Sequence, residues 1–268
     1  MEDTKFKLGD LLWLKEAGIN YYLSQNNNRA NSLNSTGNTT EPKTPEKIPL
    51  PQQKPSKSPS SEQMDIIARA RAIADKASNL AELKQALLAF DDCKLKQFAT
   101  NTVFADGVET AKIMFIGEAP GASEDLRGIP FCGESGELLD KMLASIGIYR
   151  NKNAYITNTV FWRPPANRAP TPEEINICRP FVEKHIALIA PCLIVLVGNT
   201  AATSLLGQHE GITKIRKNHY SYINKYLSSP IPTTAIFHPA YLLRQPLQKK
   251  STWFDLIKIQ QFVQEYLS

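Results

Sequence analysis

Three carboxylates crowd a turn that follows a short apolar run. Residues 112–117 (KIMFIG) are typical of a buried strand that ends in glycine, and Glu118, Glu124 and Asp125 come soon after it. Such acids could contact a ligand, because the turn leaves a buried strand at the edge where ligands bind, or they could be the solvated acids of an ordinary surface turn; taken alone, the acids favour neither. A phosphate-binding loop is disfavoured, because the acids would repel phosphate and neither a G-x-G-x-x-G run nor a Walker lysine is present.

Three further side chains stand where a ligand could be held. Phe131, in a Pro/Gly frame (IPFCG), could present an aromatic platform, although a core phenylalanine is the more common outcome. Asn158 interrupts an apolar strand, where its amide could read a donor–acceptor edge or bond to backbone. His238 ends another strand, where an imidazole could polarise a carbonyl; the alternative is a histidine that only begins a helix.

The segment after His238 combines apolar bulk with a cation. Apolar side chains can enter a duplex and separate its bases, and an arginine can reach a phosphate. The sequence therefore predicts DNA contacts at four positions, Tyr241, Leu242, Leu243 and Arg244. Upstream, the basic segment 214–217 either touches phosphate or belongs to a solvated hairpin.

The elements that must position these residues alternate between strand and helix. Apolar runs predict strands at 112–117, 154–162, 193–198 and 233–238, and helical periodicity predicts helices at 65–90, 135–146, 172–189, 200–206 and 252–266. This alternation predicts an α/β fold with three layers, α/β/α, around a central, mainly parallel, short sheet. Because ligands bind beyond the carboxyl ends of parallel strands, the loops after Gly117, around Asn158 and after Phe237 are expected to share one site.

The N-terminal quarter of the chain has a different composition. Residues 1–23 predict a short amphipathic helix, and residues 24–62, rich in Asn, Ser, Thr and Pro, predict a disordered linker because they cannot bury enough apolar surface. Residues 63–268 carry the α/β domain. A partner for the N-terminal tail is not indicated.

The bulk composition permits a nucleic-acid partner without demanding one. The 268 residues carry a formal net charge of +5, and 42% of them are hydrophobic. We expect a cytoplasmic monomer that does not associate with membranes, since no apolar run approaches the ~20 residues of a membrane helix. The four cysteines form no C-x-x-C pair and fit a reduced compartment: Cys93, Cys132, Cys178 and Cys192.

Taken in order, the motifs resemble those of the uracil-DNA glycosylase superfamily, most closely its family 4. They are GEAPG-x-x-ED, PF-x-G-x-x-G-x-LL, YITN, RPP-x-NR-x-PTPEE and HPAYLLR, spread over about residues 92–256. The resemblance implies an enzyme that flips uracil out of DNA and hydrolyses its N-glycosidic bond, which initiates base excision repair. Two rival functions remain: hydrolysis of a free nucleoside or nucleotide, which needs no strand-separating wedge, and non-catalytic recognition of damaged DNA.

The resemblance also implies a role for each candidate residue. Glu118 and Glu124, one or both, would orient the attacking water and steady a cationic sugar. Phe131 would stack on the flipped uracil, Asn158 would read its N3–H and O4 edge, and His238 would donate to O2. Two neighbours of the acidic turn are also expected at the uracil, Ala119 and Pro120. The loop that enters the duplex would be formed by Tyr241, Leu242 and Leu243, with Arg244 on phosphate.

One departure from the family concerns its iron–sulfur cluster. Family 4 enzymes typically hold a [4Fe–4S] cluster on four cysteines. Here Cys93 and Cys178 match two of those places, whereas Phe90 and Trp162 match the other two. We therefore predict no cluster, no other metal and no cofactor, with the two aromatic side chains filling the volume of the cluster.

Overall fold

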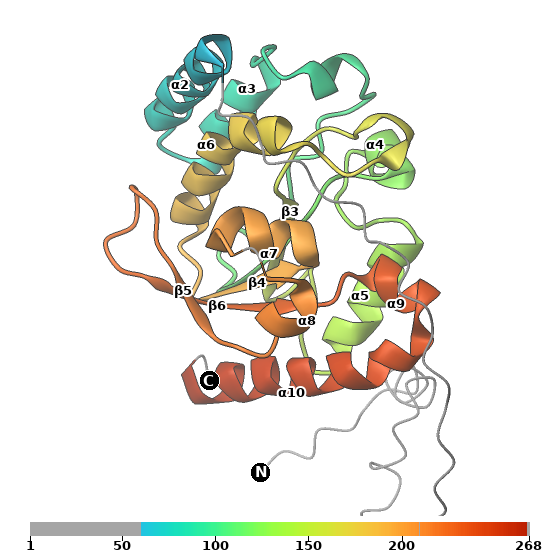
Figure 1. The fold of residues 1–268 in the computed structure, drawn as a ribbon. Coiled ribbons are helices and arrows are strands. Elements are labelled where there is room, and N and C mark those ends of the chain that lie inside the picture. Colours follow the sequence, from blue (N-terminus) through green and yellow to red (C-terminus); the bar gives the residue numbers. More distant parts are fainter. Residues whose placement is uncertain (1–59, 209, 267–268) are drawn as a thin grey trace, which may run out of the picture.

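The structure is a computed structural model that describes residues 60–208 and 210–266 (Figure 1). The predicted N-terminal helix and most of the predicted linker lie outside the described residues. The first described element, α2 (Ser61–Lys76), begins with a capping box in which the Ser60 side chain accepts from the Gln63 backbone N–H and the Gln63 side chain accepts from the Ser60 N–H. Such a cap satisfies backbone donors that a helix start otherwise leaves unpaired.

A six-stranded sheet forms the centre of the molecule, in the order β1-β3-β2-β4-β6-β5. The four inner strands pair in parallel, and the two outer strands, β1 and β5, pair antiparallel with their neighbours. The α/β prediction is thus confirmed, but the sheet is mixed. The strands are β1 (Asp106–Gly107), β2 (Ile113–Gly117), β3 (Ala154–Asn158), β4 (Leu193–Val197), β5 (Tyr220–Tyr222) and β6 (Ile231–Ile236).

Helices cover both faces of the sheet, which gives the predicted three layers (Figure 1). One face carries α2, α3 (Leu80–Leu88), α6 (Pro172–Ile189) and α7 (Asn199–Leu206). The other carries α5 (Glu134–Ala144), α9 (Pro239–Arg244) and α10 (Lys249–Tyr266). The short elements are α4 (Ala122–Arg127), α8 (Ile212–Ile215) and three 3-10 turns at Lys94–Gln97, Pro165–Asn167 and Pro246–Gln248.

The two faces of the sheet bury separate apolar cores, because side chains alternate along a strand. On β2, Met114 and Ile116 pack with the α2, α3 and α6 side, whereas Ile113 and Phe115 pack with the α5 and α10 side. All four side chains are at most 2% exposed. A strand buried on both faces reads as a continuous apolar run, which is why the sequence located β2 and β4 well.

Two predicted strands have different bounds in the structure. The predicted strand 154–162 ends at Asn158 in the structure. Beyond it, the backbone N–H groups of Thr159 and Val160 still donate to the carbonyls of Gly117 and Glu118, so the chain stays beside the end of β2. The predicted strand 233–238 begins two residues earlier, at Ile231, and ends at Ile236. His238 therefore lies just beyond the sheet and not within it.

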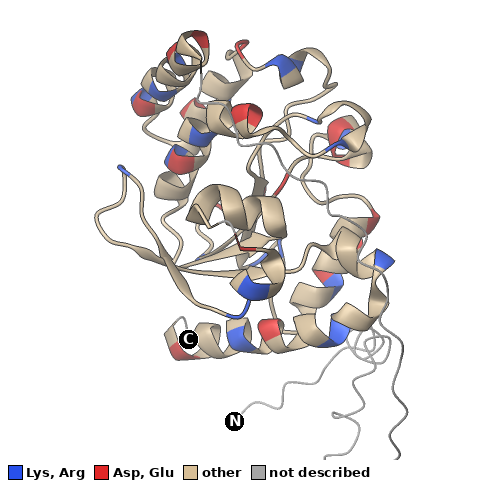
Figure 2. Cartoon of the chain, viewed as in Figure 1, with Lys and Arg blue, Asp and Glu red and all other residues tan. Residues whose placement is uncertain are grey.

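Charged residues lie mainly on the outer helices. In Figure 2, basic and acidic residues are interspersed along α2, α6 and α10. The basic segment 214–217 is no hairpin turn: Lys214 lies in α8, where its Nζ is 3.7 Å from a carboxylate oxygen of Glu210. Within residues 60–208 and 210–266, no helix has the length and apolar character needed to cross a bilayer.

Candidate active site

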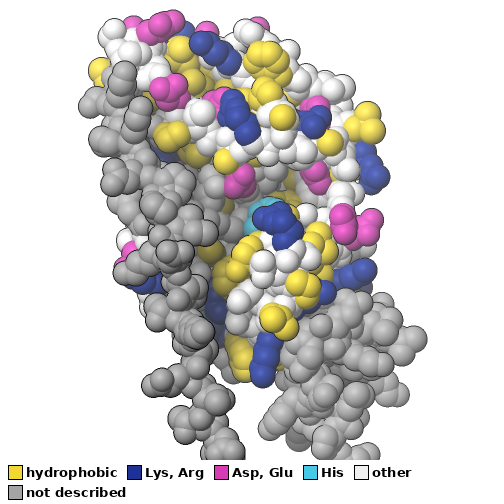
Figure 3. Space-filling model, turned by 45° about the vertical axis from the view of Figure 1, so that its right-hand side comes forward, with side chains coloured by type: hydrophobic (Ala, Val, Ile, Leu, Met, Phe, Trp, Pro, Cys, Tyr) yellow, Lys and Arg dark blue, Asp and Glu magenta, His cyan; other side chains and the backbone are white. Residues whose placement is uncertain are grey.

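A cavity of about 680 Å³ opens at the carboxyl ends of the parallel strands. Figure 3 shows this hollow with a histidine side chain inside it and acidic side chains at its edge. Its volume is within the range of about 300–1,000 Å³ common for small-molecule sites. The predicted site residues among its lining are Glu118, Ala119, Pro120, Glu124, Phe131, Asn158, His238, Tyr241 and Arg244.

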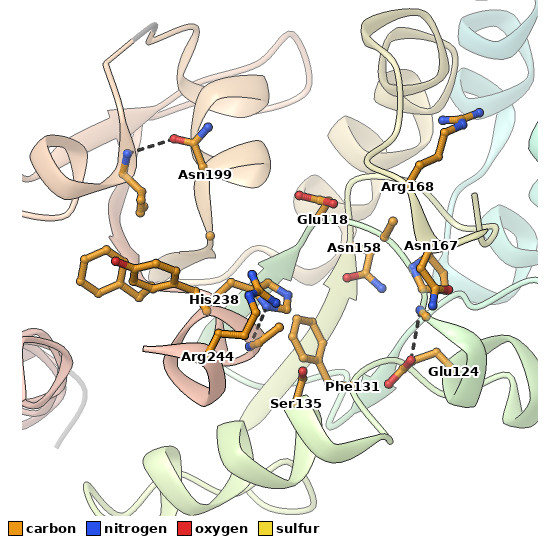
Figure 4. A pocket seen from close by; sticks show the side chains of 18 of the residues that line it. Glu118, Glu124, Phe131, Ser135, Asn158, Asn167, Arg168, Asn199, His238 and Arg244 are labelled. Atoms are coloured by element: carbon orange, nitrogen blue, oxygen red, sulfur yellow. Dashed lines mark hydrogen bonds between the residues drawn. The ribbon is translucent and has the colours of Figure 1, made fainter. Parts of the chain in front are cut away.

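Three loops distant in sequence converge on this cavity, as the sheet-edge argument predicts. In Figure 4, Glu118, Asn158 and Phe131 point into the same space, and His238 faces them from the chain that follows β6. The ring centroids of Phe131 and His238 are 5.6 Å apart. An acid, an amide, an aromatic ring and an imidazole therefore share one pocket.

The backbone of Phe131 is locked in an unusual conformation. Its φ is +50°, a left-handed value that non-glycine residues rarely adopt. Arg150 donates to the carbonyl oxygens of both Pro130 (3.0 Å) and Phe131 (2.7 Å), and these bonds stabilise the bend. Gly117 makes room for the ring, because a Cβ there would lie 2.4 Å from Phe131 Cζ.

Asn158 brings an unsatisfied acceptor to the pocket. The residue is 1% exposed, and its Oδ1 has no hydrogen-bond donor among the described residues. Buried polar atoms are nearly always paired, because an unpaired one loses its hydration without compensation. An unpaired acceptor that faces a cavity is therefore suited to a ligand N–H.

His238 has its protonation state and its tautomer fixed by the fold. Burial lowers the pKa of His238 to about 4, and the positive charge of Arg244 adds to this effect, so the ring is neutral at pH 7. Nδ1 accepts from the Ala240 backbone N–H at 3.1 Å, because His238 is the N-cap of α9. In a neutral imidazole the other nitrogen then carries the proton, which makes Nε2–H a donor.

Glu118 is held by two different parts of the chain. Its carbonyl oxygen accepts from Thr159 Oγ1 at 2.6 Å, which fixes its backbone against the end of β3. Its carboxylate oxygen Oε2 accepts a short hydrogen bond from Thr200 Oγ1. Within the described chain, Oε1 has no hydrogen-bond donor, and this oxygen can orient a water molecule.

Glu124 has a different environment from Glu118. Its Oε1 accepts from the backbone N–H groups of Cys132 and Gly133, each at 2.9 Å, and its Oε2 accepts from Gly121 N–H at 3.0 Å. These bonds tie the acidic turn to the loop that carries Phe131. Both oxygens are engaged, so the contacts of Glu124 fit a clamp for the pocket wall better than a base that activates water.

Two of the four predicted DNA-contacting residues do not line the cavity. Leu242 is fully buried in the core beneath α9, and this position does not fit the predicted wedge, because an inserted side chain must be exposed. Leu243 packs partly buried against the same core. Tyr241 and Arg244 do line the cavity, and Arg244 is exposed.

Several residues of the pocket wall were missed by sequence reasoning. Gly198 follows β4 with φ +96°, and a Cβ there would lie 2.9 Å from His238 Cβ, so glycine is needed for the histidine to sit where it does. A glycine after a buried strand was the available signal. The other lining residues outside the predicted site set are Gly121, Ser135, Asn167, Arg168, Asn199, Ile212, Thr213, Phe237 and Ala240.

Comparisons with known proteins agree with this geometry. Residues 104–259 match the family model of the uracil DNA glycosylase superfamily. The chain belongs to this superfamily. It is 38% identical over 187 residues to the type-4 uracil-DNA glycosylase of Sulfurisphaera tokodaii (68% of this chain, 84% of that protein) and 38% identical over 183 residues to that of Archaeoglobus fulgidus (68% and 92%). It is also 42% identical over 153 residues to the type-4 enzyme of Thermotoga maritima (57% and 77%).

The iron–sulfur cluster typical of family 4 glycosylases does not fit the residues of this chain. The side chains of Cys93 and Cys178 are fully buried and each thiol influences the pKa of the other, but they are only two of the four ligands that a cubane requires. Phe90 and Trp162 are buried at 2% and 1% exposure. Over the described residues, no group of three or more His, Cys, Asp or Glu side chains is arranged to hold a metal ion.

Proposed function

We propose that this protein is a uracil-DNA glycosylase, which hydrolyses the N-glycosidic bond between uracil and deoxyribose in DNA. The observation that carries the proposal is the unpaired, buried Oδ1 of Asn158, in a pocket that also presents the ring of Phe131 and the neutral imidazole of His238. Membership of the superfamily supports the same activity.

Selection of uracil follows from the polarity of Asn158. With uracil stacked on Phe131, the N3–H of the base donates to Asn158 Oδ1, and the Asn158 amide donates to O4. Cytosine presents an acceptor at N3 and a donor at C4, so both Asn158 and the base would lose their partners inside a buried site. A site that hydrogen bonds to one donor–acceptor edge strongly rejects a base with the opposite edge, because the unpaired polar groups remain desolvated.

Bond cleavage follows from the charges that develop. The C1′–N1 bond breaks and its electron pair leaves with uracil, so the base becomes an anion and the sugar an oxocarbenium-like cation. His238 Nε2–H donates to O2 of the departing anion; one such preorganised donor is commonly worth about 3–4 kcal/mol. Glu118 steadies the cation and orients water, whose oxygen bonds to C1′ while its proton passes to the carboxylate.

Access to a base in DNA requires that the nucleotide leave the stack, at a cost of a few kcal/mol. Tyr241 lines the pocket and Arg244 is exposed beside it, so the first can support the displaced nucleotide and the second can reach a phosphate. The pocket is built from one chain, which suits a monomer. The four free cysteines suit a reducing compartment such as the cytoplasm.

We also propose that the enzyme works without an iron–sulfur cluster. The ring centroids of Phe90 and Phe181 are 5.2 Å apart, and Trp162 Nε1 donates to Thr102 Oγ1 at 2.9 Å, so both aromatics are integrated in the core. Iron and sulfide analysis of protein purified without oxygen tests this: less than one iron per chain is expected, and about four would refute the proposal.

An oligonucleotide assay tests the activity. The protein is incubated with a labelled single-stranded oligonucleotide that contains one uracil, with chelator present, and the abasic product is cleaved by alkali. Cleavage at the uracil is expected, and an oligonucleotide with cytosine at that position should stay intact. No cleavage at uracil by folded protein would refute the function.

A variant separates the two rival functions. Glu118→Gln should lose uracil release while DNA retention in a mobility-shift assay persists, because the amide cannot accept a proton from water. Free deoxyuridine should not be hydrolysed by the wild type. Efficient hydrolysis of deoxyuridine would favour a nucleoside hydrolase, and retention of DNA without any base release by the wild type would favour a pure binding module.

A further inference from the structure

The carboxylate of Glu118 is held in place by a hydroxyl from α7, the helix that follows the neighbouring strand β4. Thr200 lies in the first turn of α7, 82 positions from Glu118, and its Oγ1 donates to Glu118 Oε2. We infer that Thr200 is a positioning residue for uracil hydrolysis, which acts by fixing the carboxylate of Glu118. This inference rests on the proposed function.

The bond between these two side chains completes a three-point attachment of Glu118. The Glu118 carbonyl accepts from Thr159 Oγ1 at 2.6 Å and from Val160 N–H at 3.3 Å, so its backbone is tied to the chain beyond β3. These bonds leave the side chain free to rotate into the open cavity. The Thr200 hydroxyl removes that freedom, because it fixes one oxygen and so sets where the other points.

The location of Thr200 makes the hydroxyl a rigid support. Gly198 follows β4 directly and the next residue begins α7, so Thr200 is anchored to the centre of the sheet. Neighbouring Ala201 and Ala202 are fully buried in the core. Glu118 follows β2, the strand beside β4, and the two parallel strands therefore hold donor and acceptor in register.

Loss of the hydrogen bond between Thr200 and Glu118 should change the rate of the chemical step and not the affinity for DNA. Glu118 Oε1 is the oxygen available to water, and its direction is fixed only while Oε2 is held. Misplacement of a reacting group by about 1 Å can cost about 100-fold in rate. Loss of the Thr200 hydroxyl should therefore slow single-turnover uracil release by about 10- to 100-fold, with little change in Kd for DNA.

Three substitutions test the inference against a merely structural role for Thr200. Thr200→Val keeps the shape of the side chain and removes the hydroxyl, and Thr200→Ser keeps the hydroxyl. Thr203→Val is the matched control: it lies one turn further along α7, where its hydroxyl donates only to the Thr200 carbonyl at 3.3 Å. We expect slow uracil release in Thr200→Val and in neither of the other two variants, and we expect the melting temperature of Thr200→Val to equal that of the wild type.

A double variant shows whether the effect passes through Glu118. In a Glu118→Ala background there is no carboxylate to hold, so adding Thr200→Val should leave the residual rate unchanged. The inference is overturned if Thr200→Val releases uracil at the wild-type rate, if Thr200→Ser is as slow as Thr200→Val, or if Thr200→Val slows the Glu118→Ala enzyme by the same factor. An inactive wild type would instead refute the proposed function itself.

Discussion

Gly117 is the position where one added carbon should do most damage to the site. A Cβ at Gly117 would lie 2.4 Å from Phe131 Cζ and 2.5 Å from Asn158 Oδ1. Nonbonded heavy atoms prefer about 3.5 Å, so in Gly117→Ala the stacking ring and the reading amide must each move by about 1 Å. A shift of that size costs about 100-fold in rate, or about 2.7 kcal/mol of transition-state stabilisation.

Stability should suffer less than activity in Gly117→Ala. Both side chains border the open cavity and can yield into it, so we expect a loss of only about 1–3 kcal/mol in the free energy of unfolding, as for other overpacked sites. The assay is single-turnover release of uracil from a single-stranded oligonucleotide, combined with urea denaturation.

The matched control is Gly211→Ala. Gly211 has φ −68°, which any residue can adopt, and a Cβ there would meet no atom within 4 Å. This variant should keep wild-type activity. If Gly117→Ala is folded and releases uracil within about threefold of the wild-type rate, then Phe131 and Asn158 do not hold the base in the way proposed.

Three further predictions follow from other contacts of the fold. Glu124→Gln removes the charged carboxylate that accepts from three backbone N–H groups, so it should lower the free energy of unfolding by about 1–3 kcal/mol. This loss should exceed that of Glu118→Gln in the same urea titration, and equal losses would contradict the role of Glu124 as a clamp for the pocket wall. Because burial depresses the pKa of His238 to about 4 from an ordinary 6.5, the neutral side chain contributes up to about 3 kcal/mol of stability above pH 6.5, and this contribution is lost as pH falls toward 4. The wild type should therefore lose more stability than His238→Gln between pH 6.5 and 4. An NMR titration that gives His238 a pKa near 6.5 would disprove the reasoning. Trp162→Ala should lower the free energy of unfolding, measured by denaturant titration, by about 3–5 kcal/mol, since the side chain is 1% exposed and its indole is hydrogen bonded. A loss below about 1 kcal/mol would show that Trp162 does not fill the core.

The sequence predicted the elements whose signals are local. The helix expected at 172–189 has those bounds in the structure, because Thr171 caps it and Pro172 occupies its first turn. β1 and β5 were missed: they are two and three residues long (DG and YSY), too short to show an alternating pattern. Both lie at the edges of the sheet, where one neighbour suffices to define a strand.

The division of labour between the two glutamates could not be predicted from sequence. Glu118 and Glu124 stand six residues apart in a segment that the sequence predicts as one acidic turn, and the residue pattern alone does not assign them different roles. Their difference arises from long-range partners: Thr200 reaches Glu118 from α7, and the Cys132 and Gly133 N–H groups reach Glu124 from the next loop. The same limit applies to Leu242, whose burial depends on how α9 packs.

The pocket draws its walls from residues as far apart in sequence as Glu118, which follows β2, and Arg244, which ends the helix after β6; β4 separates these two strands in the sheet. Neither half of the glycosylase domain contains all the residues that the site needs. A nascent chain released before β6 would lack His238. A domain that unfolds locally on one side of the pocket would separate the residues of that side from those that face them. Base release should thus report on the integrity of the whole domain, and destabilising substitutions remote from the pocket should lower activity in proportion to the fraction of molecules that unfold.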